Sequence, residues 1–190
     1  MQAFITEYID IVKSLMDKLD KRLIEKAIDL IFEAYKSDKQ LFIMGNGGSA
    51  STAMHFACDI GKGTIIEVKK RFRVISLNDN IALITAISND YGYEHVFSEQ
   101  LKNLVNEKDI IVAISASGNS PNLLNAVDYA KQKGAFTISF VGFDGGNLKQ
   151  KSDLCIHIEN YNYGKIEDIH LFLCHIISHA IKGKIEDNVF

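Results

Sequence analysis

Residues 41–59, LFIMGNGGSASTAMHFACD, decide the fold of this chain. They open with the four apolar residues LFIM, and a run that is too short for a helix and bounded by Gly predicts a buried strand. The loop that follows, GNGGS, contains glycines that permit positive φ angles and close approach of the backbone to a ligand. A helical pattern then begins, with Ser49 or Ser51 as the expected N-cap.

This strand–loop–helix turn predicts an anion site, because free N–H groups and the positive end of the helix dipole point at one spot. Phosphate is the first candidate for the anion. A nucleotide is not, since the loop matches neither the GK[ST] ending of a P-loop nor GxGxxG. Taken alone, the loop is also consistent with a tight turn that binds nothing.

Length and composition limit the class of protein. The 190 residues fit one domain covering 1–190, and a hydrophobic content of 47% argues against disorder. A net charge of −3 gives no reason to expect a nucleic acid or an anionic membrane as partner. The three cysteines form no CxxC pair, the N-terminus lacks a basic signal, and no apolar run approaches the ~20 residues that cross a bilayer. We therefore expect a soluble cytoplasmic protein.

Two helices are predicted before the first strand. Apolar residues recur at helical spacing over 3–19 and again over 22–36. The first of these helices carries a wide apolar stripe and lies outside any strand–helix unit. It either covers the sheet or packs against a second subunit, and we expect residues 1–37 to serve in oligomer packing.

The remaining chain alternates strands and helices, which implies an α/β fold with a five-stranded parallel sheet covered on both faces. Further strands are predicted at 72–77, 109–114, 135–141 and 154–158. Helices are predicted from 49 onward and at 80–87, 94–105, 121–133 and 165–181, with turns at 89–93 and 144–146. In the common strand order 2-1-3-4-5, ligands bind where strands one and three are neighbours, and the loops at 45–49 and 115–120 follow those two strands.

The second of these loops, SASGNS at 115–120, offers three hydroxyls from Ser115, Ser117 and Ser120. Ser120 is a good N-cap and Pro121 a good first residue for the next helix. Hydroxyls and backbone N–H groups hold a phosphate monoester without a fixed cation. The alternative role of these serines is ordinary capping and turn formation, and Ser120 is suited to both.

Imidazoles and carboxylates gather in two of the predicted helices. His55 and Asp59 stand four residues apart, a spacing that suits metal ligation, acid–base chemistry or simply a local hydrogen bond. The last helix carries Glu167, Asp168, His170, His175 and His179. Opposite a phosphate loop, this cluster indicates Zn²⁺ ligands or an acid–base pair. His95 and His157 lack such neighbours, and we expect them to be structural or exposed.

Together these features suggest proton transfer on a sugar phosphate. Aldose–ketose isomerisation needs one group that takes a proton from the carbon beside a carbonyl and returns it to the neighbouring carbon. A second group, or a metal, must polarise the carbonyl oxygen. The predicted phosphate cradle, imidazoles and carboxylates supply each of these parts.

Five stretches in the same order resemble one known family: GNGGSASTAMHFACD, AISNDYGYEHVFSEQ, ISASGNSPN, GFDGGNL and KIEDIHLFLCHII. The chain resembles the sugar isomerase (SIS) domain proteins, most closely the phosphoheptose isomerase branch. The resemblance implies a flavodoxin-like α/β layer with added helices and a homotetramer with active sites between subunits. It implies conversion of sedoheptulose 7-phosphate to D-glycero-D-manno-heptose 7-phosphate. A related metal-dependent isomerase or epimerase, and a non-catalytic SIS protein that senses a sugar phosphate or binds a protein, are the alternatives.

The resemblance also implies roles for individual residues. Substrate binding falls to Asn46, Gly47, Ser49, Asp90, Ser115, Ser117, Ser120 and Glu167. One Zn²⁺ per subunit would be held by His55, Asp59, Glu167 and His175. Asp59 and His175 would also form the acid–base pair.

This chain departs from the family pattern at the catalytic end. The family has Glu at the position of Asp59, Gln at that of Glu167 and Arg at that of Gly63, where Lys62 is the nearest cation. It also has an acidic residue at the position of Gly164. Asp is one methylene shorter than Glu, and a misplacement of about 1 Å costs ~100-fold in rate. Because the phosphate loops are intact, the sequence supports phosphosugar binding more firmly than the exact reaction.

Overall fold

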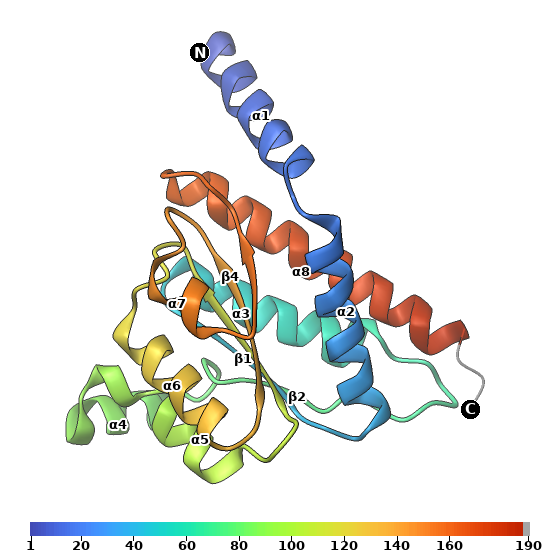
Figure 1. Cartoon of the computed structure of the whole chain (residues 1–190), viewed down its shortest axis with the longest axis vertical. Coiled ribbons are helices and arrows are strands. Elements are labelled where there is room, and N and C mark those ends of the chain that lie inside the picture. Colours follow the sequence, from blue (N-terminus) through green and yellow to red (C-terminus); the bar gives the residue numbers. More distant parts are fainter. Residues whose placement is uncertain (188–190) are drawn as a thin grey trace.

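The computed structural model describes residues 1–187, and its centre is a sheet of five parallel strands (Figure 1). The strands are β1 (Leu41–Gly45), β2 (Val74–Ser76), β3 (Ile110–Ser115), β4 (Phe136–Val141) and β5 (Leu154–His157). Their order is β2-β1-β3-β4-β5, so the predicted order 2-1-3-4-5 and the α/β class are confirmed. β1 is buried along its whole length, as expected for a strand covered on both faces.

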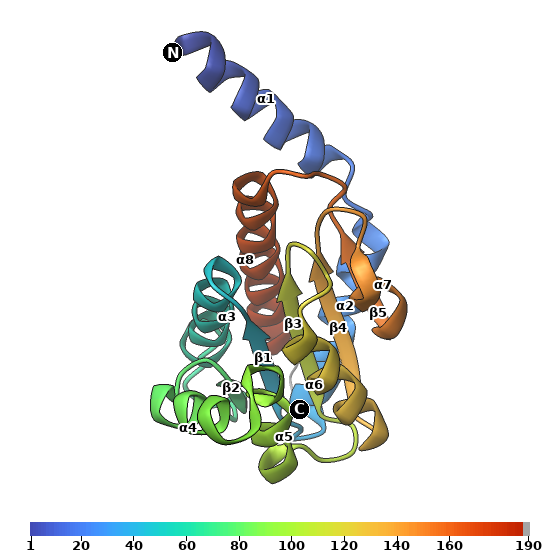
Figure 2. The same ribbon diagram turned by 90° about the vertical axis from the view of Figure 1, so that its left-hand side faces the viewer.

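Helices cover both faces of the sheet (Figures 1 and 2). One apolar cluster joins the sheet to α2 (Lys21–Lys36), α3 (Gly48–Cys58) and α8 (Tyr163–Asp187). A second cluster joins the other face to α4 (Ile81–Tyr91), α5 (Ser98–Leu104), α6 (Pro121–Gln132) and α7 (Gly146–Lys151). Neighbouring residues of β1 divide between them, with Ile43 in the first cluster and Met44 in the second. Within residues 1–187, no helix is both long and apolar enough to span a bilayer.

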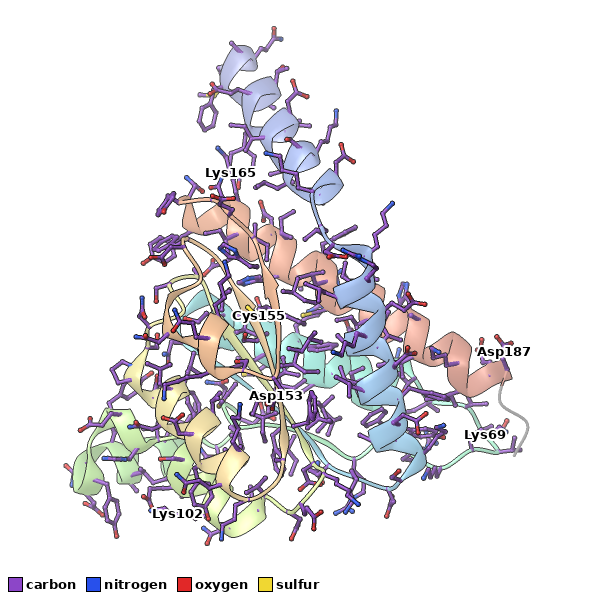
Figure 3. The ribbon with its side chains drawn as sticks, in the orientation of Figure 1. Lys69, Lys102, Asp153, Cys155, Lys165 and Asp187 are labelled. Atoms are coloured by element: carbon purple, nitrogen blue, oxygen red, sulfur yellow. The ribbon has the colours of Figure 1, made fainter. Side chains whose placement is uncertain are left out.

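The first half of helix α1 (Gln2–Asp17) projects away from the sheet (Figure 2), whereas Leu15 near its end is buried in the first apolar cluster. Tyr8 joins this helix to α8. Its hydroxyl donates to Asp168 Oδ2 over 2.8 Å, and the Lys165 ammonium lies over the Tyr8 ring at 5.1 Å from the ring centre (Figure 3). Phe4 is 64% exposed, and Ile5 and Ile9 are also exposed. Of the two predicted roles, contact with the core is found for the end of this helix, while the exposed residues at its start lie outside both apolar clusters of residues 1–187.

The N-cap of α3 differs from the prediction. The helix begins at Gly48 with Gly47 as N-cap, and Gly47 has a φ of 56° and no side chain to form a cap bond. Ser49 and Ser51 lie inside the helix, so neither is the cap. The turn is so tight that it requires glycine at position 45, because a Cβ there would stand 2.6 Å from the carbonyl carbon of Ser49.

Several boundaries also differ from the sequence pattern. α4 continues into the predicted turn as far as Tyr91, and Gly92, with a φ of 97°, is its C-cap. The helix predicted over 94–105 is a 3₁₀ turn, η2 (Tyr93–His95), followed by α5. The short helix α7 and the π-helix η1 (Asp59–Gly63) were not predicted, because segments of six and five residues are too short to show a hydrophobic period.

His170 on α8 provides a test of the packing between that helix and the sheet. It is fully buried beside Phe140, and neither ring nitrogen has a hydrogen-bond partner among residues 1–187. Burial lowers the pKa of His170 from 6.5 to about 4. The backbone of Val141 acts in the opposite direction and raises the pKa, but by less than burial lowers it.

Below pH 6.5 the unfolded chain therefore binds a proton at His170 that the folded chain does not. We expect stability to fall by about 3 kcal/mol from this group between pH 7 and pH 4. Urea unfolding at several pH values should show a shallower pH dependence in His170→Leu than in wild type. His95→Gln should keep the wild-type slope, and an unchanged slope in His170→Leu would contradict the assignment.

Candidate active site

The two predicted loops meet at one edge of the sheet. β1 and β3 pair in parallel, with Gly45 opposite Ile114, so the loops that leave these strands begin side by side. Each loop leads directly into a helix, α3 after the first and α6 after the second. The structure thus brings the two Gly/Ser loops to the switch point at which open α/β sheets bind ligands.

A network of side chains fixes the first loop. Asn46 and Asn122 exchange two amide hydrogen bonds of 2.9 Å, and the Tyr93 hydroxyl donates to Asn46 Oδ1 over 2.9 Å. Ser49 is buried in the first turn of α3. The sequence pattern does not predict a role for Asn122 or Tyr93, because no spacing rule joins either residue to Asn46. Both nevertheless lie in stretches that carry the family resemblance.

The serines of the second loop close its turn with their oxygens. Ser115 Oγ accepts from the backbone N–H of Gly118 at 3.1 Å, and Ser117 Oγ accepts from that of Asn119 at 3.3 Å. Accepting these bonds leaves each hydroxyl proton able to donate to a ligand. Ser120 occupies the N-cap position of α6 without a side-chain cap bond, so its hydroxyl is also uncommitted. The turn-forming and ligand-binding roles of these serines are therefore compatible.

Glu167 lies against the first loop rather than with the histidines. A Cβ built on Gly48 would stand 2.5 Å from both carboxylate oxygens of Glu167. The carboxylate therefore rests on the first residue of α3, where the helix dipole favours an anion. It is a negative charge beside the position at which a phosphate is expected.

Removing that charge should strengthen phosphate binding. Repulsion between a carboxylate and a phosphate dianion about 6 Å apart in a solvated site is worth about 1 kcal/mol, or about fivefold in affinity. We expect Glu167→Gln to bind inorganic phosphate about fivefold more tightly by calorimetry. Glu25→Gln, which makes the same change of net charge on the exposed side of α2, should leave the affinity unchanged. Weaker binding in Glu167→Gln would contradict this reading.

His55, Asp59 and His175 form a second centre between α3, η1 and α8. The Nε2 atoms of His55 and His175 are 3.0 Å apart. Asp59 Oδ2 lies 3.3 Å from His55 Nε2 and 3.7 Å from His175 Nε2. That carboxylate oxygen is buried and has no hydrogen bond among the described residues. Three donor atoms thus converge on one point.

The spacing of these atoms fits a metal ion. Ligand atoms about 2.05 Å from a tetrahedral Zn²⁺ are about 3.3 Å from one another, which matches the three distances. Three protein ligands would leave one position open, as catalytic zinc sites do. Within residues 1–187 the group contains His55, Asp59 and His175. The structure does not bring Glu167, the fourth predicted ligand, into it.

The other titratable groups near the site take different places. Asp90 is exposed at the end of α4, where its carboxylate accepts from the Asn89 side chain. Among residues 1–187 no hydrogen bond or ion pair joins Asp90 to the two loops. His157 bonds to the Phe143 carbonyl, as expected for a structural histidine. Burial, with the nearby Asp59 carboxylate, raises the pKa of the Cys174 thiol far above its usual range, so this cysteine is not a nucleophile.

Several known proteins are similar to this chain in sequence and in fold. The family model described as "SIS domain" matches residues 3–142. A phosphoheptose isomerase of Helicobacter pylori (strain P12) is 37% identical over 171 residues, which are 90% of this chain and 88% of the relative. The solved phosphoheptose isomerase structures from Neisseria gonorrhoeae and Francisella tularensis have TM-scores of 0.87 and 0.88, at 29% and 26% identity, over 96% of each chain. The chain belongs to the SIS domain family and, within it, to the phosphoheptose isomerases.

Proposed function

We propose that this protein converts sedoheptulose 7-phosphate to D-glycero-D-manno-heptose 7-phosphate by acid–base proton transfer. The observation that carries the proposal is the convergence of His55, Asp59 and His175 where α8 packs against η1 and against α3, the helix that follows the first Gly/Ser loop. A protein that only binds a sugar phosphate and catalyses no reaction has no use for two imidazoles and a carboxylate placed together. Membership of the phosphoheptose isomerases supports the same reaction.

One set of residues would bind the substrate, and another would carry out the proton transfer. Loop N–H groups with the hydroxyls of Ser49, Ser115, Ser117 and Ser120 would bind the phosphate, with Asn46 and Gly47 shaping the first loop and Asp90 as a further substrate contact. The acid–base pair, Asp59 and His175, would then act on the two carbons at the far end. One takes the proton from C1 of the ketose, and the same proton is delivered to C2. The other moves a proton between the two oxygens, so that the carbonyl passes from C2 to C1.

We propose one Zn²⁺ per subunit as the cofactor. His55, Asp59 and His175 would hold it, with Glu167 as a further ligand if its carboxylate leaves Gly48. When bound, the ion would polarise the carbonyl oxygen and stabilise the charge that develops there. The unpartnered oxygen of Asp59 and the spacing of the two imidazole nitrogens support this assignment.

We also propose assembly as a homotetramer. The support is the exposed apolar stripe at the start of α1, which includes Phe4, Ile5 and Ile9 and lies outside both apolar clusters of residues 1–187. Burial of such a stripe against other subunits would remove it from water.

We propose the cytoplasm as the compartment of this protein. A substrate that is a free sugar phosphate agrees with this assignment.

Turnover of sedoheptulose 7-phosphate by purified protein, with Zn²⁺ added or removed by a chelator, tests the reaction. NMR of the product should show heptose 7-phosphate in the zinc-loaded sample and a large loss after chelation. The same measurement shows whether Asp59 reaches the substrate despite its shorter side chain. Saturable binding without product would overturn the proposal and indicate another sugar phosphate or a sensor.

A further inference from the structure

The first Gly/Ser loop has few side chains that could fix its shape. Residues 45–48 are GNGG, so Asn46 is the one residue among them with a side chain. Glycine has more conformational freedom to lose than any other residue, and Gly47 has a φ of 56°. Backbone N–H groups bind an anion tightly only when they already point at it before it arrives. Asn46 is therefore the side chain through which this loop can be held in its binding conformation.

The hydrogen bonds of Asn46 saturate its side-chain oxygen. That oxygen accepts from Asn122 Nδ2 and from the Tyr93 hydroxyl, each over 2.9 Å. Asn46 Nδ2 in turn donates to Asn122 Oδ1 over 2.9 Å. An amide oxygen has two lone pairs, so two accepted bonds leave none for a ligand. The oxygen of Asn46 thus binds its neighbours rather than a substrate.

Asn122 is held firmly by the second half of the site. It lies in the first turn of α6, which begins at the second Gly/Ser loop, and it is only 2% exposed. Its Oδ1 also accepts from the backbone N–H of Leu123 over 3.0 Å, and Leu123 is fully buried in the second apolar cluster. The amide pair therefore joins the first loop to the helix that carries the second loop.

Tyr93 adds a third segment to the same amide. It lies on η2, and η2 is attached to α6 because Asn125 Nδ2 donates to the Glu94 carbonyl over 2.9 Å. The Tyr93 ring is 53% exposed, so burial does little to hold it in place. Its hydroxyl nevertheless reaches Asn46. Three segments that are distant in the sequence thus meet at the side chain of Asn46.

We infer that Asn122 and Tyr93 are positioning residues of the phosphate site. They act through Asn46, keep the N–H groups of the first loop pointing at the anion, and need not touch the substrate themselves. The inference rests on the proposed function, since it concerns the loop that would bind the phosphate, and it adds two residues to that function. The competing explanation is that these bonds only fasten η2 and α6 to the sheet. In that case stability would depend on them and phosphate affinity would not.

Tyr93→Phe is the first variant, because it removes one hydroxyl and retains a ring that is already exposed. Loss of one neutral hydrogen bond is worth about fivefold in an equilibrium constant. We expect Tyr93→Phe to bind inorganic phosphate about fivefold more weakly than wild type, measured by calorimetry on the full chain. Asn122→Ala removes two hydrogen bonds to Asn46, and we expect it to bind phosphate about 20-fold more weakly.

Two further measurements separate positioning from direct contact and from a merely structural role. In an Asn46→Ala background, Tyr93→Phe should cause no further loss of phosphate affinity, since the hydroxyl has already lost its partner. A fivefold loss that persists in that background would show that Tyr93 contacts the anion itself. In turnover, Tyr93→Phe should raise KM and leave kcat within about twofold, because a phosphate contact is the same in the ground state and the transition state.

Asn125→Ala is the matched control. It removes the bond from α6 to η2 and leaves Asn46 with both of its partners. It should bind inorganic phosphate as wild type does. Wild-type affinity in both Tyr93→Phe and Asn122→Ala, or an equal loss in Asn125→Ala, would overturn the inference, even if the wild-type protein isomerises sedoheptulose 7-phosphate.

The same binding data distinguish this inference from the proposed reaction. A wild-type protein that binds phosphate, shows the expected losses in the variants and turns over no sugar phosphate would support the positioning role and overturn only the reaction. A wild-type protein that binds no inorganic phosphate would overturn both.

Discussion

Replacement of His175 by Ala should lower kcat/KM for sedoheptulose 7-phosphate by about 10³-fold or more. General acid–base catalysis alone contributes roughly 10²- to 10⁴-fold, and His175 is in addition one of the three converging donor atoms. The ring is half-exposed, so its removal should leave the fold intact, which far-UV circular dichroism can check. Activity within tenfold of wild type would contradict the role given to His175.

The pairing of His175 with Asp59 makes a sharper test. The two side chains lie 3.7 Å apart and are proposed to act as a unit. Residues that act together show strongly non-additive losses. We therefore expect the double variant Asp59→Asn/His175→Ala to be no slower than His175→Ala alone. His95→Ala, on η2, is the control for loss of an imidazole elsewhere and should keep its activity. Additive losses would indicate that the two residues act independently.

Replacement of Gly118 by Ala should have the largest effect on stability. Gly118 has a φ of 66°, and a Cβ there would lie 2.7 Å from the carbonyl carbon of Gly145 and closer still to its oxygen. The left-handed conformation costs about 1–2 kcal/mol with a side chain, and the clash with backbone adds to it. We expect a loss of about 3 kcal/mol or more, which at this chain length lowers Tm by about 6–12 °C. Weaker phosphate binding should accompany it, since Gly118 lies between Ser117 and Ser120.

Gly183→Ala provides the matched control for Gly118→Ala. Gly183 lies inside α8, and within the described part of the chain a Cβ there would meet no atom closer than 4 Å. Ala in such a helical position is favoured over Gly by about 0.5–1 kcal/mol. Thermal unfolding should therefore show an unchanged or slightly raised Tm for Gly183→Ala. An equal loss of stability in both variants would show that packing against Gly145 is not the cause.

The strand order and the two Gly/Ser loops could be predicted because their signals are local. A buried strand followed by GNGGS, and another followed by SASGNS, specify two turns within a few residues each. The rule that parallel sheets bind ligands at the switch point then places both turns together. His55 and Asp59 were equally accessible, since a separation of four residues on a helix fixes their proximity.

The contacts between distant elements had no such local signal. The sequence pattern places Glu167 and His175 on one helix face, but only the packing of α8 along α3 puts the first against Gly48 and the second against His55. The same holds for the bond between Asn46 and Asn122, seventy-six positions apart in the chain. Asp59 and Lys182 likewise line one small cavity only because η1 packs against α8.

The sequence by itself determined the order of strands and helices, the two loops and the residue types available for proton transfer. Each of these depends on hydrophobic period, turn chemistry or spacing along one element. Only the tertiary structure decided which of those residues meet, because side-chain contacts between elements depend on how buried faces pack. That is why His55, Asp59 and His175, three of the four predicted metal ligands, come together while Glu167 rests against Gly48 at the start of α3.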